Sequence, residues 1–235
     1  MRTTVAATPV IVAIDGPSGT GKSSTSKAVA ARLGLGYLDT GAQYRAMTWW
    51  MLANGVDVND PAAVAAACGK PSIVSGTDPL APTITVDGTD VAGPIRGPEV
   101  TAAVSAVSAV PEVRARITAL QRAIAASATA GMVVEGRDIG TTVLPDADVK
   151  IFLTASPEAR AARRSAELAG TGGRGADVNA TREALVRRDA ADAGRATSPM
   201  AKAEDATEVD TTELTLEQVI ECVISLVEER ERPRP

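Results

Sequence analysis

The chain has 235 residues, of which 45% are hydrophobic and 2% aromatic, and it carries 24 lysine and arginine residues against 29 aspartate and glutamate residues. This length suits one α/β domain with a core made mostly of Val, Leu, Ile and Ala, and leaves room for an inserted subdomain. The net charge of −5 argues against a general binder of nucleic acid or anionic membranes, and two cysteines without any histidine argue against a disulfide framework, most zinc sites and histidine-dependent nucleophilic catalysis.

An apolar strand is predicted over residues 11–15, and an Ala/Val-rich helix over residues 24–33 follows it after a glycine-rich loop. The loop has the spacing Gly-x4-Gly-Lys-Ser, which between a strand and a helix is the P-loop pattern for nucleoside triphosphates. Its glycines let successive N–H groups face a polyphosphate, and the positive end of the helix adds to this. Lys22 is expected to reach the β- and γ-phosphates of ATP, and the Ser23 hydroxyl to bind Mg²⁺. The residues predicted to bind ATP are Gly16, Pro17, Ser18, Gly19, Thr20, Gly21, Lys22, Ser23 and Ser24.

The middle of the chain combines predicted helices with short strands and turns. Helices are predicted over residues 42–53, 99–110 and 111–126, and both tryptophans of the first are expected to pack on the core. Between residues 54 and 98, glycine and proline turns separate short strands over residues 72–74 and 83–86. A hairpin turn is expected at Asp87-Gly88. This pattern predicts a small β-containing subdomain inserted into the α/β core.

The second half alternates strands and helices. Strands are predicted over residues 132–135, 149–154 and 207–210, and helices from Ser156-Pro157 onward, over 177–192 and over 215–229. This alternation implies a mostly parallel sheet with helices on both faces. A glycine-rich connector over residues 170–175, which contains Arg174, suggests a short mobile lid.

Three polar groups lie beyond the P-loop. Thr40 and Arg45 are one to two helical turns apart, and Glu135-Gly136-Arg137-Asp138 follows a core strand at the end where open α/β sheets bind ligands. Arg188 and Asp192 are four residues apart and share a helix face. Each group alone could be ordinary surface charge or a helix ion pair. Together with a P-loop, and with arginines bunched on an acidic protein, they indicate a site for two ligands.

These motifs resemble those of the bacterial cytidylate kinases, members of the nucleoside monophosphate kinase family of P-loop proteins, along essentially the whole chain. The resemblance is carried by residues 15–23, 39–45, 95–96, 99–100, 135–145, 150–153 and 188–195. It implies a P-loop kinase fold in a single domain over residues 1–235. The core would cover about 8–40, 111–156 and 177–235, the subdomain that binds the nucleoside monophosphate about 41–110, and the lid about 157–176. Thr40 in place of serine and Glu135 in place of aspartate are conservative departures from the commonest pattern.

The resemblance implies transfer of the ATP γ-phosphoryl group to CMP and dCMP with Mg²⁺. The residues implied to bind the acceptor are Thr40, Arg45 and Arg137 at its phosphate, Ser105, Arg114 and Asp138 at its cytosine, and Arg188 and Asp192 at its ribose, with Arg195 near the phosphates. The implied catalytic residues are Lys22, Arg137, Arg163 and Arg164, and the lid region also contains Arg160 and Arg174. The partners would be these small molecules, without nucleic acid or membrane, and the protein a monomer in the cytoplasm.

The chemistry of the acceptor supports the same interpretation. A carboxylate facing the cytosine amino group and an arginine facing N3 or O2 would pair the polar atoms of that edge. The acceptor phosphate is largely dianionic at neutral pH, so it attacks in line without a general base. No apolar run reaches membrane-spanning length, and the N-terminal run leads into the P-loop, so the mature protein is expected to start near residue 1.

Two alternatives stay open from the residues alone. One is a kinase of the same superfamily that acts on AMP, shikimate or another small molecule, which a panel of acceptors would separate. The other is a nucleotide switch of GTPase type, which would need an Asn-Lys-x-Asp motif. The asparagines of this sequence, at 54, 59 and 179, precede Gly, Asp and Ala, which argues against the switch.

Overall fold

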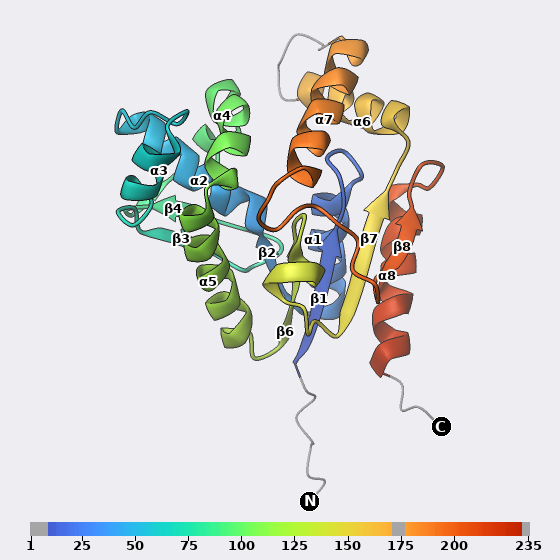
Figure 1. Cartoon of the computed structure of the whole chain (residues 1–235). Coiled ribbons are helices and arrows are strands. Elements are labelled where there is room, and N and C mark those ends of the chain that lie inside the picture. The colour runs from blue at the N-terminus through green and yellow to red at the C-terminus, as the bar shows by residue number, and fades with distance from the viewer. Residues whose placement is uncertain (1–8, 171–176, 232–235) are drawn as a thin grey trace, which may run out of the picture.

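A central sheet of five parallel strands in the order β2-β6-β1-β7-β8 organises the molecule (Figure 1). The strands are β1 Val10–Asp15, β2 Gly36–Asp39, β6 Gly131–Glu135, β7 Val149–Thr154 and β8 Thr207–Asp210. The structure is a computed structural model, and it describes residues 9–170 and 177–231. Because all the strands point the same way, their carboxyl ends, and the loops that follow them, meet at one edge.

Helices cover both faces of this sheet. On one face lie α1 (Lys22–Leu33) and α8 (Leu216–Glu231), which share a hydrophobic cluster with β1 and β7 in which Val29 is fully buried. On the other face lie α5 (Pro111–Ser127) and η2, a π-helical turn over Ile139–Val143. The predicted α/β fold, with a parallel sheet wound on both faces, is confirmed.

Between β2 and β6 the chain forms an insert, which lies beside the sheet at the left of Figure 1. Its elements are α2 Thr40–Ala53, α3 Pro61–Ala67, β3 Ile73–Ser75, β4 Ile84–Val86, β5 Thr89–Asp90, η1 Pro94–Arg96 and α4 Pro98–Ala109. The strands form an antiparallel sheet in the order β3-β4-β5. The predicted hairpin turn joins β4 to β5, where Asp87 has φ 50° and Gly88 φ 80°. Trp49 and Trp50 pack against the hydrophobic cluster of the insert, as predicted.

Two helices, α6 (Pro157–Gly170) and α7 (Val178–Ala193), pack against each other above the carboxyl ends of the strands (Figure 1). They flank the connector that was predicted to form a lid. Residues 171–176, with Arg174, lie outside the described residues. Within 9–170 and 177–231, no helix is both long and apolar enough to cross a membrane.

Three local features differ from the sequence predictions. The first helix begins at Lys22, directly after Gly21, and not at residue 24. The helix α3 was not predicted, because Asp60-Pro61 has the composition of a turn; here the Asp60 carboxylate accepts the Ala62 N–H at 2.9 Å and caps the helix instead. The turn η2 was also not predicted, since two of its N–H groups donate to Asp15, which is distant in sequence.

Candidate functional site

The P-loop has the backbone that its glycines predict. Gly16 has φ 139° and Gly19 φ 80°, both in the region that L side chains rarely adopt. Space adds a second constraint, because a Cβ on Gly16 would lie 2.1 Å from the Leu153 carbonyl oxygen and one on Gly19 3.0 Å from that of Arg160. The loop therefore sits tightly between β7 and α6, and it leads into the N-terminus of α1, where an anion is favoured.

A polar cluster lies beside the start of α1. The Lys22 ammonium donates to the Pro17 carbonyl at 2.6 Å, and the Ser23 hydroxyl donates to Glu135 Oε2 at 3.0 Å. The Tyr37 hydroxyl donates to the other oxygen of Glu135. Burial raises the pKa of the Glu135 carboxyl and lowers the pKa of the Lys22 ammonium. The cluster offers hard oxygen donors of the kind Mg²⁺ prefers, next to a lysine suited to phosphate.

A cavity of about 600 Å³ extends from the P-loop to the insert. Its walls include residues of the P-loop, α2, α4, α5, the loop after β6, α6 and α7. All the residues implied to bind the acceptor line it, namely Thr40, Arg45, Ser105, Arg114, Arg137, Asp138, Arg188, Asp192 and Arg195. Ser18, Gly19, Gly21, Lys22, Ser23 and Ser24 of the P-loop line the same cavity. The fold thus brings the donor and acceptor motifs together in one space.

The end of the cavity that faces the insert contains a buried ion pair. The Arg114 guanidinium binds Asp138 Oδ2, and the two side chains are only 3% and 6% exposed. A second nitrogen of Arg114 donates to the Ser108 carbonyl at 3.2 Å, and the Tyr44 ring lies 5.3 Å from the guanidinium carbon. Burial raises the pKa of the Asp138 carboxyl, and the charge of Arg114 opposes this rise. A donor and an acceptor are therefore held side by side and largely buried, as recognition of one base edge requires.

Asp192 joins the two ends of the cavity. Its Oδ2 accepts from Arg137 Nε at 3.0 Å, and its Oδ1 lies 2.8 Å from Arg195 Nη2. The helix ion pair that the spacing suggested, between Asp192 and Arg188, is thus replaced by pairs with Arg137 and Arg195. Arg137 also donates to the Gly16 carbonyl and to the Ser18 hydroxyl. Its guanidinium lies directly between the P-loop and the acceptor residues.

Arg45 and Arg188 are partly buried, and each lies near other arginines. Burial, with the charges of Arg188 and Arg96, lowers the pKa of Arg45 to about 10. Burial, with the charge of Arg137, also lowers the pKa of Arg188, whose buried Nε has no hydrogen-bond partner. The alternative of ordinary solvated surface charges does not fit this geometry. Guanidinium groups that repel one another in a cavity favour binding of an anion such as a phosphate.

The arginines of α6 lie in three different environments. Arg164 lines the cavity and pairs with Glu167 at 2.7 Å. Arg163 instead donates to the Thr211 hydroxyl at 2.9 Å and to main-chain carbonyls after β8. The predicted catalytic role therefore has geometric support for Arg164 and none for Arg163, whose hydrogen bonds hold α6 to the segment that leads into α8.

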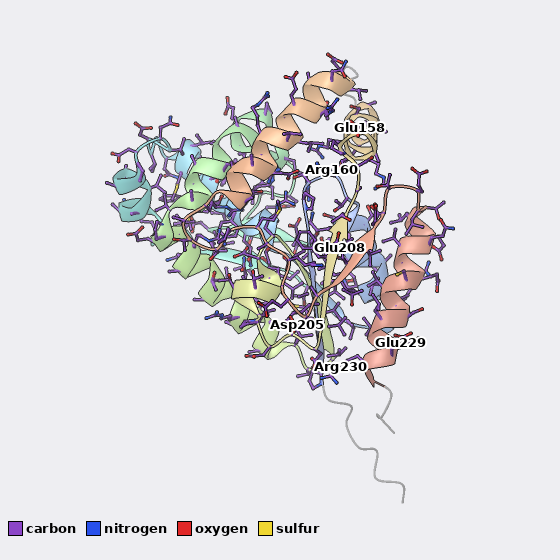
Figure 2. All side chains as sticks on the ribbon, turned by 45° about the vertical axis from the view of Figure 1, so that its right-hand side comes forward. Glu158, Arg160, Asp205, Glu208, Glu229 and Arg230 are labelled. Carbon is purple, nitrogen blue, oxygen red and sulfur yellow. The ribbon has the colours of Figure 1, made fainter. Side chains whose placement is uncertain are left out.

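Arg160 contacts the P-loop, a role that sequence reasoning did not assign. Its Nη1 donates to the Ser18 carbonyl at 3.2 Å and pairs with Asp189, while Asp189 Oδ1 accepts the Ser18 N–H at 3.2 Å. Figure 2 shows Arg160 at the base of α6, far from Glu229 and Arg230 at the opposite end of the molecule. Both sides of the Ser18 residue are thus held by an ion pair between α6 and α7.

Sequence reasoning also passed over other polar residues of the site. Glu135 was placed in the polar group at the end of a core strand but was given no role, although its carboxylate accepts the Ser23 hydroxyl. Asp189 directly follows Arg188, and that adjacency to a motif residue was the available signal. Tyr44 lies inside the motif at residues 39–45, yet the spacing alone gave no reason to place its ring beside Arg114.

Comparison with known proteins agrees with this site. The family model described as Cytidylate kinase matches residues 12–229. Cytidylate kinases from Streptomyces coelicolor and Streptomyces avermitilis are 78% and 77% identical, each over 94% of both chains. A crystal structure of an uncharacterized protein from Eubacterium ventriosum is similar in fold, with a TM-score of 0.50 at 13% identity over 94% of this chain and 98% of that one. The chain belongs to the cytidylate kinase family.

Proposed function

We propose that the protein transfers the γ-phosphoryl group of ATP to the phosphate of CMP and dCMP, which yields CDP and dCDP. The observation that supports this most directly is the continuous cavity that joins the P-loop to the buried Arg114–Asp138 pair. Arg45, Arg137 and Arg188 line the space between these two ends. A triphosphate at one end, a base at the other and phosphates between them match that distribution of charge.

The Arg114–Asp138 pair would select cytosine. Cytosine presents an amino donor beside the N3 and O2 acceptors, so Asp138 accepts from the amino group while Arg114 donates to the ring. Uracil would place an acceptor oxygen against the Asp138 carboxylate, so two acceptors would face each other in a buried site. Such a mismatch costs about 1–3 kcal/mol, which corresponds to roughly tenfold to hundredfold discrimination.

The residues between the two ends would bind and align the acceptor phosphate. Arg45 and Arg188 supply positive charge at the insert and at α7, and Arg137 reaches from Asp192 to the P-loop. The acceptor phosphate is its own nucleophile, so the task of these residues is to hold two mutually repelling anions in line. No general base is required, because the attacking oxygen carries no proton that must be removed.

The residues present fit ATP and Mg²⁺. The P-loop supplies main-chain donors and Lys22, and the oxygens of Ser23 and Glu135 lie 3.0 Å apart at the start of α1. Mg²⁺ in kinases takes one or two protein ligands and completes its shell with phosphates and water. Bound here, Mg²⁺ would offset negative charge on the transferring group. Glu135 would thus be the second protein residue, beside Ser23, that holds the ion directly or through water.

Further parts of the proposal concern the protein as a whole. The helices α6 and α7 would exclude water during transfer, with Arg164 facing the phosphates from α6. The protein would act as a monomer in the cytoplasm, with nucleotides as its partners. Its products would serve as precursors for nucleotide supply.

A coupled assay of ADP release from Mg·ATP tests the proposed reaction. CMP, dCMP, UMP, AMP, GMP and shikimate are supplied separately as acceptors. Strong turnover with CMP and dCMP, and weak turnover with the others, is the expected result. Preference for another acceptor would overturn the assignment of the Arg114–Asp138 pair to cytosine while leaving the P-loop assignment in place.

A further inference from the structure

The turn η2 lies directly after Asp138 and begins with two main-chain donors that need partners. The first N–H groups of any helical turn have no acceptor within the turn itself. Here the N–H of Ile139 donates to Asp15 Oδ1 at 2.9 Å, and the N–H of Gly140 donates to Asp15 Oδ2 at 2.8 Å. Asp15 is the last residue of β1, and it immediately precedes the P-loop. A single carboxylate therefore binds two successive amides of a segment far away in sequence.

Asp138 occupies the position that would normally provide this cap. An aspartate at the N-cap of a helical turn usually accepts from the N–H groups of the next residues with its own side chain. The Asp138 side chain makes no such hydrogen bond; its carboxylate binds Arg114 instead. The Asp138 main-chain carbonyl still accepts from Thr142 and Val143, at 2.9 and 3.1 Å, so the turn is otherwise complete.

We propose that Asp15 caps η2 in place of Asp138, and thereby frees the Asp138 carboxylate to face Arg114 and the acceptor base. Asp15 is not among the residues that line the cavity, so its role is that of a positioning residue for base specificity. This inference rests on the proposed function, because it explains how the cytosine-binding carboxylate is kept available. It also links the strand that carries the P-loop to the residue that reads the base.

The packing around the contact leaves little freedom. A Cβ on Gly140 would lie 3.2 Å from Lys150 Cδ and 3.5 Å from Asp15 Oδ2, so side chains already pack closely around this residue. The Ile139 side chain is 1% exposed and belongs to the hydrophobic cluster on this face of the sheet. The Gly136 N–H donates to the Ile14 carbonyl at 3.0 Å, which extends the contact between the ends of β1 and β6. With η2 fixed on both sides, the cap decides where Asp138 points.

The test is the variant Asp15→Asn. An asparagine has the same shape, but its amide can accept only one of the two N–H groups and turns an NH₂ donor toward the other. The Asp138 carboxylate then becomes the acceptor for the abandoned amide and leaves Arg114. The matched control is Asp60→Asn, which alters a capping aspartate on α3, away from the cavity.

Steady-state kinetics with CMP, UMP and ATP give the main readout. For Asp15→Asn we expect the KM for CMP to rise about tenfold and the preference for CMP over UMP to fall about tenfold, with the KM for ATP changed by less than about twofold. Hydrogen exchange of the Ile139 and Gly140 amides should accelerate in the same variant. Asp60→Asn should change none of these values.

Other outcomes would overturn the proposal. Unchanged CMP kinetics would do so, as would equal losses for CMP and ATP accompanied by lower thermal stability, since these indicate a structural role only. If Asp15→Asn fails to fold, Asp15→Ser, which keeps one shorter acceptor beside the two amides, must show the same selective loss for CMP. The acceptor preference of the wild-type enzyme tests the proposed function. The change in the KM for CMP and in the preference for CMP over UMP, from wild type to Asp15→Asn, tests the role of Asp15, so the two can fail separately.

Discussion

The carboxylate of Asp138 is buried beside Arg114, and its replacement by an amide would change what the pocket can accept. The variant Asp138→Asn can turn a donor toward the donor amino group of cytosine, and it leaves Arg114 without its counter-charge. We expect kcat/KM for CMP to fall about 10- to 100-fold, with a smaller change for UMP. Kinetics with both acceptors check this. Asp205→Asn, at an exposed carboxylate that pairs with Lys150, is the control, and an unchanged ratio of CMP to UMP would contradict the assignment.

Asp15 also makes stability depend on pH. Burial raises the pKa of its carboxyl to about 6, while the hydrogen bonds from Gly140 and Ile139 oppose the rise. Since the native carboxyl binds a proton more readily than the unfolded one, stability from this residue decreases as pH rises from about 4 to 6. The total effect is on the order of 3 kcal/mol at most. Urea unfolding across this range should show a steeper decline for wild type than for Asp15→Asn; parallel curves would refute this prediction.

The pair of helices α6 and α7 holds the P-loop through one residue of each. Arg160 and Asp189 bind the carbonyl and the N–H of Ser18 and pair with each other, with side chains 8% and 13% exposed. In Asp189→Asn the oxygen that accepts the Ser18 N–H is kept, but the charge that balances Arg160 is lost. Because removing one partner of a buried pair is strongly destabilising, we expect a lower melting temperature and a KM for ATP raised about tenfold.

The control for this variant lies on the same two helices. Glu158→Gln removes a pair with Arg182 that also joins α6 to α7, but both side chains are exposed. Exposed pairs contribute only about 0–1 kcal/mol, so this variant should bind ATP normally. Equal effects of the two substitutions would mean that the contact between the helices matters and the contact to Ser18 does not.

Elements that local sequence controls could be predicted, and those that depend on distant partners could not. The core strands are short apolar runs between turn residues, and the hairpin at Asp87-Gly88 follows from residues that tolerate positive φ. The turn η2 depends on Asp15, which lies on another strand. The position of Arg163 also depends on a distant segment, because its guanidinium donates to a carbonyl after β8. The sequence around Arg163 therefore could not distinguish it from an arginine that faces the phosphates. Motif spacing identified the residues of the cavity, but could not tell which of them pair.

At the scale of the whole molecule, arginines from different elements face the same cavity. Arg45 extends from the insert, whereas Arg188 comes from α7. A ligand present at a hundredfold its dissociation constant stabilises a protein by about 2.7 kcal/mol. For CMP this predicts a rise in melting temperature of roughly 5–11 °C in a chain of this size. In Arg45→Met the rise with CMP should shrink while the rise with ATP persists, and calorimetric melting with each ligand would show it. Equal shifts in variant and wild type would exclude Arg45 from the acceptor site.

The strand order has a consequence for synthesis of the protein. The strand β1 is made first, yet its neighbours in the sheet are β6, which begins at Gly131, and β7, which begins at Val149. The N–H and C=O groups along its two edges thus stay without their strand partners while the ribosome makes the entire insert, and non-local pairings of this kind form slowly. The insert and α5 share a hydrophobic cluster that can assemble before then. The P-loop is therefore among the first segments to emerge and among the last to take its final shape.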